Sequence, residues 1–193
     1  MLLKNDSFEI EIKVAEKFTK ESVDKGGYDF IYNPVDFDFA GDFMKYYDIS
    51  VKSADGILKI ALIGDYYIYE EDCAVFENGI LTLLLEDEIA RIDVKTGEFL
   101  SFIKLDIYGL GEKIYKIPGR YIIKGELQIV FLNENFEKTG DFSARDIFHC
   151  TDGKNPFVIC EDRIKVFDFL DDYFEIDFDG KLIKEEINPN VKW

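Results

Sequence analysis

The amino-acid sequence predicts an all-β protein, mainly antiparallel, built of repeated hairpin units of about 40 residues. Turns that contain glycine recur at that interval, and their glycines are Gly56, Gly97, Gly140 and Gly180. The segments between them are rich in β-branched and aromatic residues, and the whole chain contains 18 Phe and 11 Tyr. Such residues pack well on pleated sheets. We expect one domain that spans residues 1–193.

Residues 1–45 precede the repeats and predict strands with one short helix. Residues 7–14 alternate apolar and charged side chains, which is the period of a half-buried strand. Residues 15–23 are charged and are compatible with a short helix that ends at the following glycine pair. Residues 28–32 are rich in aromatic and β-branched side chains and predict a further strand.

Residues 46–187 form the repeated hairpin region. Residues 57–63 and 80–85 are nearly continuous apolar runs, which suit strands that are covered on both faces. We expect hairpins in sequence order, with Gly97, Gly140 and Gly180 in tight turns between paired strands. Residues 188–193 read as a tail.

One of the turn segments resembles a known repeat. Residues 85–98 read as strand, turn, strand and turn, and their core resembles the inner hairpin of quinoprotein-like β-propeller repeats. Residues 123–141 resemble it less closely. The resemblance implies that Asp93 accepts hydrogen bonds from the turn backbone and that Gly97 has a positive φ. It implies no quinone cofactor. The chain has room for four such units at most, so a small or incomplete β-propeller-like fold and a curved stacked-sheet architecture both fit.

The charge balance is strongly acidic. Asp and Glu number 40 and Lys and Arg number 23, which gives a formal net charge of −17. Such a charge repels nucleic acids and anionic membranes, and the basic residues form no stripe that would bind phosphates. It attracts basic proteins and speeds encounter with them. Solubility alone also explains it.

The cysteines and the N-terminal sequence indicate a reducing compartment. Cys73, Cys150 and Cys160 are an odd number without a Cys-x-x-Cys pair, so we expect free thiols, most of them buried. The chain begins without a signal-peptide pattern, and we expect a cytoplasmic protein. His149 is the only histidine. It adjoins Cys150, but neighbours on a strand point to opposite faces, so a catalytic pair is disfavoured.

Three groups of carboxylates stand out. They are Asp36/Asp38/Asp42, Glu70/Glu71/Asp72, and Asp168/Asp171/Asp172 with Asp177/Asp179. A calcium loop that begins at Asp177 would need a glutamate at its twelfth position, where Asn188 stands, so a plain hairpin turn is favoured. Paired carboxylates also serve glycoside hydrolysis, but so acidic a chain offers many pairs.

The composition favours a non-enzymatic protein-binding module that neutralises a basic partner. In physical character it resembles bacterial immunity proteins and nuclease inhibitors, which use carboxylates to cap a basic active site. The alternatives are a carbohydrate-binding or carbohydrate-hydrolysing β-protein and a structural repeat of a larger assembly. We predict no catalytic residue, no cofactor and no metal site, and the oligomeric state stays open. The candidate partner-binding residues are Asp36, Phe37, Asp38, Asp42, Arg145, Asp146, Asp171, Asp172 and Tyr173. A second interpretation makes Arg145 and Asp146 part of a salt bridge that joins two repeats.

Overall fold

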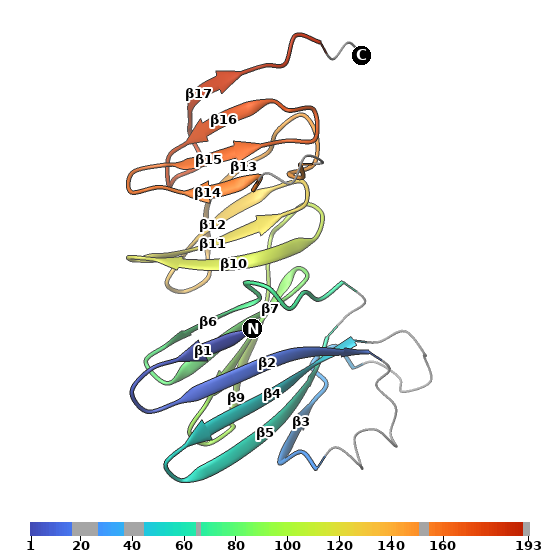
Figure 1. Ribbon diagram of the computed structural model, residues 1–193, viewed down its shortest axis with the longest axis vertical. Helices are drawn as coiled ribbons and strands as arrows, with labels where there is room; N and C mark the ends of the chain where they lie inside the picture. Colours follow the sequence, from blue (N-terminus) through green and yellow to red (C-terminus); the bar gives the residue numbers. More distant parts are fainter. Residues whose placement is uncertain (17–26, 37–44, 65–66, 151–154, 191–193) are drawn as a thin grey trace. The chain divides into compact units, whose positions relative to one another are not determined.

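The structure is a computed structural model that describes residues 1–16, 27–36, 45–64, 67–150 and 155–190 (Figure 1). Within these residues every helix-or-strand element is a β-strand, so none is a helix long and apolar enough to cross a membrane. The prediction of an all-β protein is confirmed. The chain divides into two compact units, Met1–Lys104 and Leu105–Trp193, which are described separately. The expected single domain stays a prediction.

The first unit begins with a five-stranded sheet. Its strands are β1 (Leu2–Lys4), β2 (Glu9–Glu16), β3 (Phe30–Tyr32), β4 (Lys45–Ser53) and β5 (Gly56–Ile63). They lie in the order β1-β2-β4-β5-β3, and only β3 pairs in parallel, with β5. The alternation predicted for β2 is present, because Ile10 and Ile12 are buried while Glu9 is half-buried and Glu11 is exposed.

The second sheet of this unit is an antiparallel meander. Its strands are β6 (Ala74–Glu77), β7 (Ile80–Leu85), β8 (Glu88–Asp93) and β9 (Phe99–Lys104). The apolar run that forms β7 is buried from Leu81 to Leu85, as expected for a strand covered on both faces. Apolar side chains of both sheets share one core cluster, which includes Ile49, Leu62 and Leu83.

The second unit consists of two further antiparallel meanders. The first contains β10 (Gly111–Ile117), β11 (Arg120–Gly125), β12 (Ile129–Asn133) and β13 (Lys138–Phe142). The second contains β14 (Phe157–Ile159), β15 (Ile164–Phe167), β16 (Tyr173–Ile176) and β17 (Leu182–Glu186), drawn in orange and red in Figure 1. Both contribute to a core cluster around Phe131, Phe148 and Phe174. The prediction of hairpins in sequence order is therefore confirmed.

The three meanders repeat the same turn before their fourth strand. The side-chain oxygen of Asp93 accepts the N–H groups of Lys95 and Thr96, each at 2.9 Å. Asn133 and Asp177 each accept two backbone N–H groups of their own turns in the same way. These turns begin about 40 residues apart, which is the predicted repeat length.

The fourth strand of each meander carries a bulge. The pairing register shifts so that one residue is left without a partner across the strand pair, namely Leu100, Thr139 and Ile183. An inserted residue of this kind bends the strand and increases its twist. Turn and bulge together define the repeat more closely than the glycines do.

Gly140 is not in a turn, and that prediction was wrong. Gly97 and Gly180 do occupy the turns before β9 and β17, with φ of 79° and 81°. Gly140 lies inside β13, because the turn of its meander ends earlier and places Phe136 at φ 64°. A Cβ atom at Gly140 would overlap the carbonyl group of Asp179, so the glycine permits a close approach of two backbones.

The cysteines agree with the prediction, whereas most of the predicted helix and the tryptophan of the tail lie outside the described residues. Cys73, Cys150 and Cys160 are all free, and the first two are buried, which confirms the predicted thiols. The charged segment expected to form a helix, residues 15–23, begins as the end of β2, and its residues 17–23 lie outside the described residues. Trp193 also lies outside them.

Candidate functional site

Four of the predicted partner-binding residues belong to the first unit. Asp36 is exposed and has a positive φ of 51° in the turn after β3. Phe37, Asp38 and Asp42 lie outside the described residues. Their assignment to partner binding stays a prediction.

The other five lie in the second unit, where Arg145 and Asp172 meet. The Arg145 guanidinium donates to Oδ2 of Asp172 through Nε at 2.6 Å and through Nη2. Because Arg145 follows β13 and Asp172 precedes β16, this ion pair joins two consecutive meanders. Asp172 is fully buried, so a partner could reach exposed Asp171 but not this carboxylate. Asp146 is half-buried and caps the N–H of Ile147.

Tyr173 is half-buried and belongs to a polar network on β16. Its hydroxyl donates to Oε1 of Glu175 at 2.6 Å, and the other oxygen of Glu175 accepts from Arg163 at 2.5 Å. Desolvation, followed by the hydrogen bond to Glu175, raises the pKa of Tyr173 to about 12. The phenol is therefore a fixed neutral donor within its own sheet.

Two carboxylates, Asp168 and Asp172, are buried near one turn. Oδ1 of Asp168 accepts the N–H groups of Leu170 and Asp172, each at 3.0 Å, but its Oδ2 has no hydrogen-bond partner. Burial raises the pKa of Asp168, while Asp172 is paired with Arg145. Two neighbouring carboxyl groups, one of them with a raised pKa, are an arrangement that glycosidases use. Both side chains have no exposed surface, however, so a sugar cannot reach them.

A different group combines exposed aromatic and acidic side chains. It lies between β5 and β6 and consists of Tyr67–Asp72, which we call the tyrosine–acid loop. Tyr67 is 46% exposed and Tyr69 38% exposed, whereas Ile68 between them is only 3% exposed. Glu70 and Glu71 are exposed and Asp72 is half-buried. Exposed tyrosines next to carboxylates are typical of protein-binding surfaces that attract a basic partner.

Buried side chains hold the backbone of this loop in place. The Tyr47 hydroxyl lies 2.9 Å from the carbonyl oxygen of Leu84 and 3.0 Å from that of Tyr69, and the two oxygens share its single proton. Burial keeps the pKa of Tyr47 well above its usual value, so the donor stays protonated. Ile68 packs closely over Gly64, where a Cβ atom would lie 2.8 Å from its side chain. The fold of the first unit thus fixes the conformation of the loop.

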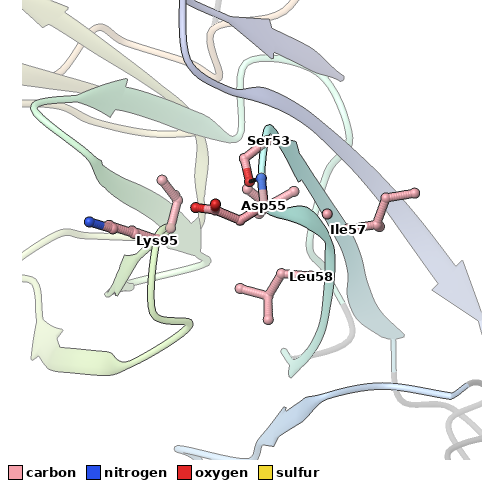
Figure 2. Close-up of a pocket in the computed structure, with 8 residues that line it drawn as sticks. Ser53, Asp55, Ile57, Leu58 and Lys95 are labelled. Atoms are coloured by element: carbon pink, nitrogen blue, oxygen red, sulfur yellow. Dashed lines mark hydrogen bonds between the residues drawn. The ribbon is translucent and has the colours of Figure 1, made fainter.

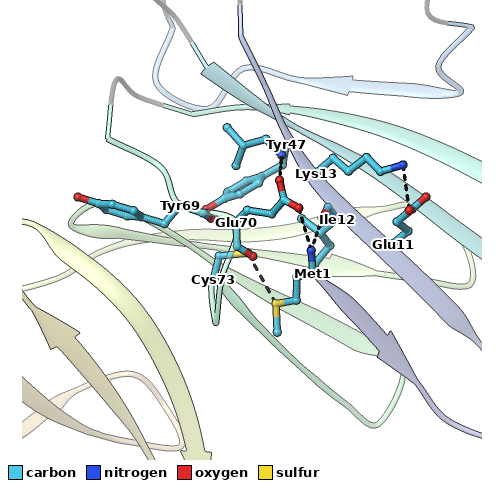
Figure 3. A network of polar contacts seen from close by, with 9 residues as sticks. Met1, Glu11, Ile12, Lys13, Tyr47, Tyr69, Glu70 and Cys73 are labelled. Atoms are coloured by element: carbon cyan, nitrogen blue, oxygen red, sulfur yellow. Dashed lines mark hydrogen bonds and ion pairs between the residues drawn. The ribbon is translucent and has the colours of Figure 1, made fainter. Parts of the chain in front are cut away.

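A polar network fixes the acidic end of the loop (Figure 3). The Met1 ammonium group donates to the carbonyl oxygen of Ile12 at 2.7 Å and to Oε1 of Glu70 at 3.4 Å. The other oxygen of Glu70 accepts the N–H of Val14 at 3.4 Å. The Cys73 thiol donates to the carbonyl oxygen of Glu70, and burial raises its pKa to about 11. In Figure 3 the Tyr69 ring points away from this network.

A hollow of about 390 Å³ lies beside the loop. Its lining comprises Met1, Glu70, Glu71 and Asp72. The Met1 ammonium group pairs with Glu70, and the lining also contains the carboxylates of Glu71 and Asp72. Carboxylates form charge-assisted hydrogen bonds with the head group of a lysine or arginine side chain.

A second hollow of the first unit is about 200 Å³ (Figure 2). It lies at the β4–β5 turn, and its polar lining residues are Ser53, Asp55 and Lys95. The Ser53 hydroxyl accepts the N–H of Asp55 at 3.2 Å, which serves the turn. The volume is below the roughly 300–1,000 Å³ typical of ligand sites, so we assign it no ligand.

The remaining candidate groups from the sequence are His149 with Cys150 and the turn that begins at Asp177. His149 is exposed while Cys150 is buried. Oδ1 of Asp177 accepts the N–H groups of Asp179 and Lys181, so it stabilises a hairpin turn. Among the described residues, no group of three or more His, Cys, Asp or Glu side chains is arranged to hold a metal ion.

Sequence reasoning found half of the tyrosine–acid loop. It singled out Glu70, Glu71 and Asp72 but not Tyr67 and Tyr69, because aromatic residues near a strand read as core. The available signal was Ile68 between two tyrosines: if the apolar residue of an alternating segment is buried, its neighbours point outward.

Comparison with known proteins places the fold. Neither a protein-family model nor a curated protein sequence matches the chain. The solved structures that it resembles include the computationally designed Ika8 protein, at 9% identity over 96% of this chain and 60% of Ika8, with a TM-score of 0.52. They also include BamB from Moraxella catarrhalis, a β-propeller, at 12% identity over 77% of this chain and a TM-score of 0.45. The chain spans about half the length of BamB. At such low identity the likeness to Ika8 concerns fold alone, and the strand pairing shows an all-β protein built of repeated antiparallel hairpins.

Proposed function

We propose that the chain is a non-enzymatic protein-binding module that associates with a basic partner through the tyrosine–acid loop. One observation supports this most directly. Tyr67 and Tyr69 are exposed beside Glu70, Glu71 and Asp72, on a loop that buried side chains hold in one conformation. This combination supplies both apolar contact area and charge complementarity, which protein interfaces need together.

The two kinds of side chain have different roles in the proposed complex. The net charge of −17 accelerates encounter with a basic protein. The tyrosine rings then slow dissociation, because they exclude water over a large area and lose little conformational entropy. A lysine or arginine of the partner enters the hollow bordered by Glu71 and Asp72. Binding a lysine or arginine of a basic active site in this way would neutralise that site, as an immunity protein or inhibitor does.

Kinetic measurements on variants test this proposal. The partner is first captured on the immobilised chain. Capture alone does not support the proposal, and the association and dissociation rates of the variants decide it. We expect Tyr67→Ala with Tyr69→Ala to speed dissociation at least about tenfold, since each tyrosine anchor contributes about 1 kcal/mol or more. Glu71→Gln with Asp72→Asn should instead slow association, and added salt should slow wild-type association in the same way.

Matched controls come from the other unit. Tyr108 is 71% exposed and Glu185 is exposed on β17, so Tyr108→Ala and Glu185→Gln should leave both rates unchanged. Dissociation that is insensitive to the tyrosine pair would overturn the assignment of the loop. Tight binding of a neutral glycan, independent of salt, would favour the carbohydrate-binding alternative.

Two finer assignments are part of the same proposal. The cytoplasmic location is supported by the three cysteines, none of which is bonded to another. The quinoprotein-like character of residues 90–98 is supported by the turn of Asp93 and the positive φ of Gly97. Neither assignment brings a cofactor with it.

A further inference from the structure

A hollow of about 400 Å³ lies in the second unit where three turns meet. The turn between β10 and β11 contributes Ile117, Pro118 and Arg120. The turn between β14 and β15 contributes Ile159, Cys160 and Glu161, and the turn before β17 contributes Phe178. The volume falls within the range of about 300–1,000 Å³ that small-molecule sites occupy.

The walls of this hollow are mostly apolar. Ile117, Ile159 and Phe178 are half-buried, and Pro118 stands at the rim. A predominantly apolar wall with a small number of polar groups is the usual composition of a ligand site. The polar groups therefore decide which ligands it takes.

The charges at the hollow do not cancel. Nη1 of Arg120 donates to Oδ1 of Asp179 at 2.8 Å and to the carbonyl oxygen of Phe178. The hydrogen bond from Arg120 lowers the pKa of Asp179, and the ion pair with this carboxylate compensates the charge of Arg120. Glu161 is exposed, and among the described residues its carboxylate has no hydrogen-bond or ion-pair partner. The uncompensated charge is negative.

We propose that this hollow binds a small organic cation with an apolar body, such as an aromatic amine. The ammonium group pairs with Glu161, and the ring lies against Ile117, Ile159 and Phe178. The aromatic face of Phe178 adds a further attraction for the cation. The net charge of the chain raises the local concentration of such ligands. This site is separate from the tyrosine–acid loop and does not depend on its function.

The rate at which the Cys160 thiol is modified reports whether a ligand occupies the hollow. It lines the hollow and is half-buried, whereas Cys73 and Cys150 are buried, so a neutral reagent such as N-ethylmaleimide should modify Cys160 first. Phenethylammonium should slow this modification about threefold at twice its dissociation constant, which we expect to be about millimolar for so small a ligand. Phenylacetate, which carries the opposite charge on a similar ring, should protect Cys160 much less.

Variants separate the carboxylate from the apolar walls. Glu161→Gln should remove the advantage of phenethylammonium over phenylacetate, while Glu185→Gln on β17 should preserve it. Mass spectrometry of the labelled protein confirms that Cys160 is the modified residue. Equal protection by the two probes, protection that survives in Glu161→Gln, or none at about 10 mM phenethylammonium would each overturn the proposal. The comparison of the two probes on the wild-type chain decides the matter even if a variant fails to fold.

Discussion

Tyr47 connects a core position to a surface loop through one hydroxyl group. Its side chain is fully buried, yet its hydroxyl reaches the carbonyl oxygens of Leu84 on β7 and Tyr69 in the tyrosine–acid loop. Without that donor, the carbonyl groups of Leu84 and Tyr69 both lose a hydrogen-bond partner. The bond to Tyr69 also positions this exposed tyrosine. A buried acceptor that loses its donor costs more than the bond itself contributes.

We therefore expect Tyr47→Phe to destabilise the first unit by about 1–3 kcal/mol, because the ring is kept while the donor is lost. Urea unfolding measures this change. Amide exchange of the loop should speed up more than exchange in β2. Tyr108→Phe serves as the control, since Tyr108 is largely exposed. Unchanged exchange in the loop would show that Tyr47 does not hold it.

Asp168 makes a pH-dependent contribution of the opposite sign to that of Asp93 and Asp162, whose pKa values hydrogen bonds lower. Its folded pKa is raised by burial, so the folded state binds the proton more tightly than the unfolded state. Its contribution to stability is full below about 3.8 and is lost as pH rises through the raised folded pKa.

Comparison of wild type with Asp168→Asn isolates this contribution. The free energy of unfolding of the wild type, minus that of the variant, should fall as pH rises upward from about 4. Urea unfolding at several pH values measures it. Asp162→Asn is the control of opposite sign, because hydrogen bonds from Arg163 lower the pKa of Asp162. A difference for Asp168→Asn that rises with pH would contradict the assignment.

At the level of single residues, the sequence predicted turn chemistry better than turn position. Asp93 and Gly97 behave as expected because an Asp oxygen and a glycine with positive φ form a recognisable local motif. The turn that begins at Asn133 places Phe136 at positive φ, which a sequence pattern would not suggest for a bulky residue. The exposure of Tyr67 depends on burial of Ile68 in a core assembled from two sheets, which local sequence does not encode.

Neighbouring meanders of the second unit approach each other at two glycines. A Cβ atom at Gly140 of β13 would overlap Asp179, and one at Gly180 would lie 2.6 Å from the carbonyl oxygen of Asp141. The ion pair of Arg120 with Asp179 lies at the same contact. Strand and turn therefore meet backbone to backbone, with no side chain between them.

Gly140→Ala should lower the stability of the second unit by about 1–3 kcal/mol, since a rigid backbone group must move to make room. Thr139→Ala, at the neighbouring exposed bulge, should lower it by about 1 kcal/mol or less, because it removes only the hydrogen bond from the Thr139 hydroxyl to the carbonyl oxygen of Phe131. Thermal and urea unfolding measure both. A Gly140→Ala variant as stable as Thr139→Ala would mean that the contact yields easily. Gly119→Ala shows the cost of backbone conformation alone, because a Cβ atom at Gly119 would have no neighbour within 4 Å while its φ is 77°.

Charge is distributed unevenly over the whole molecule. Residues 1–104 contain twice as many acidic as basic side chains, whereas the excess is smaller in residues 105–193. The proposed partner-binding loop lies in the more acidic unit, where long-range attraction of a basic protein is greater. Composition alone predicted the sign of this attraction, but which carboxylates adjoin exposed aromatic side chains required the fold.

The thiols provide a test of the fold across both units. Native protein should react with N-ethylmaleimide at one thiol, Cys160, much faster than at the buried Cys73 and Cys150. Denatured protein without reductant should show all three. Rapid modification of Cys73 in the native state would contradict its burial and its raised pKa. A count below three after denaturation would indicate a disulfide.

The bulges at Leu100, Thr139 and Ile183 also bear on how the protein behaves when concentrated. An outermost strand with regular, unpaired backbone groups is a template on which identical chains stack into cross-β fibrils. In β9, β13 and β17 the inserted residue interrupts that template, and β17 adds the charges of Lys184, Glu185 and Glu186. The same irregularity that marks the repeat thus discourages aggregation of a chain rich in aromatic and β-branched residues.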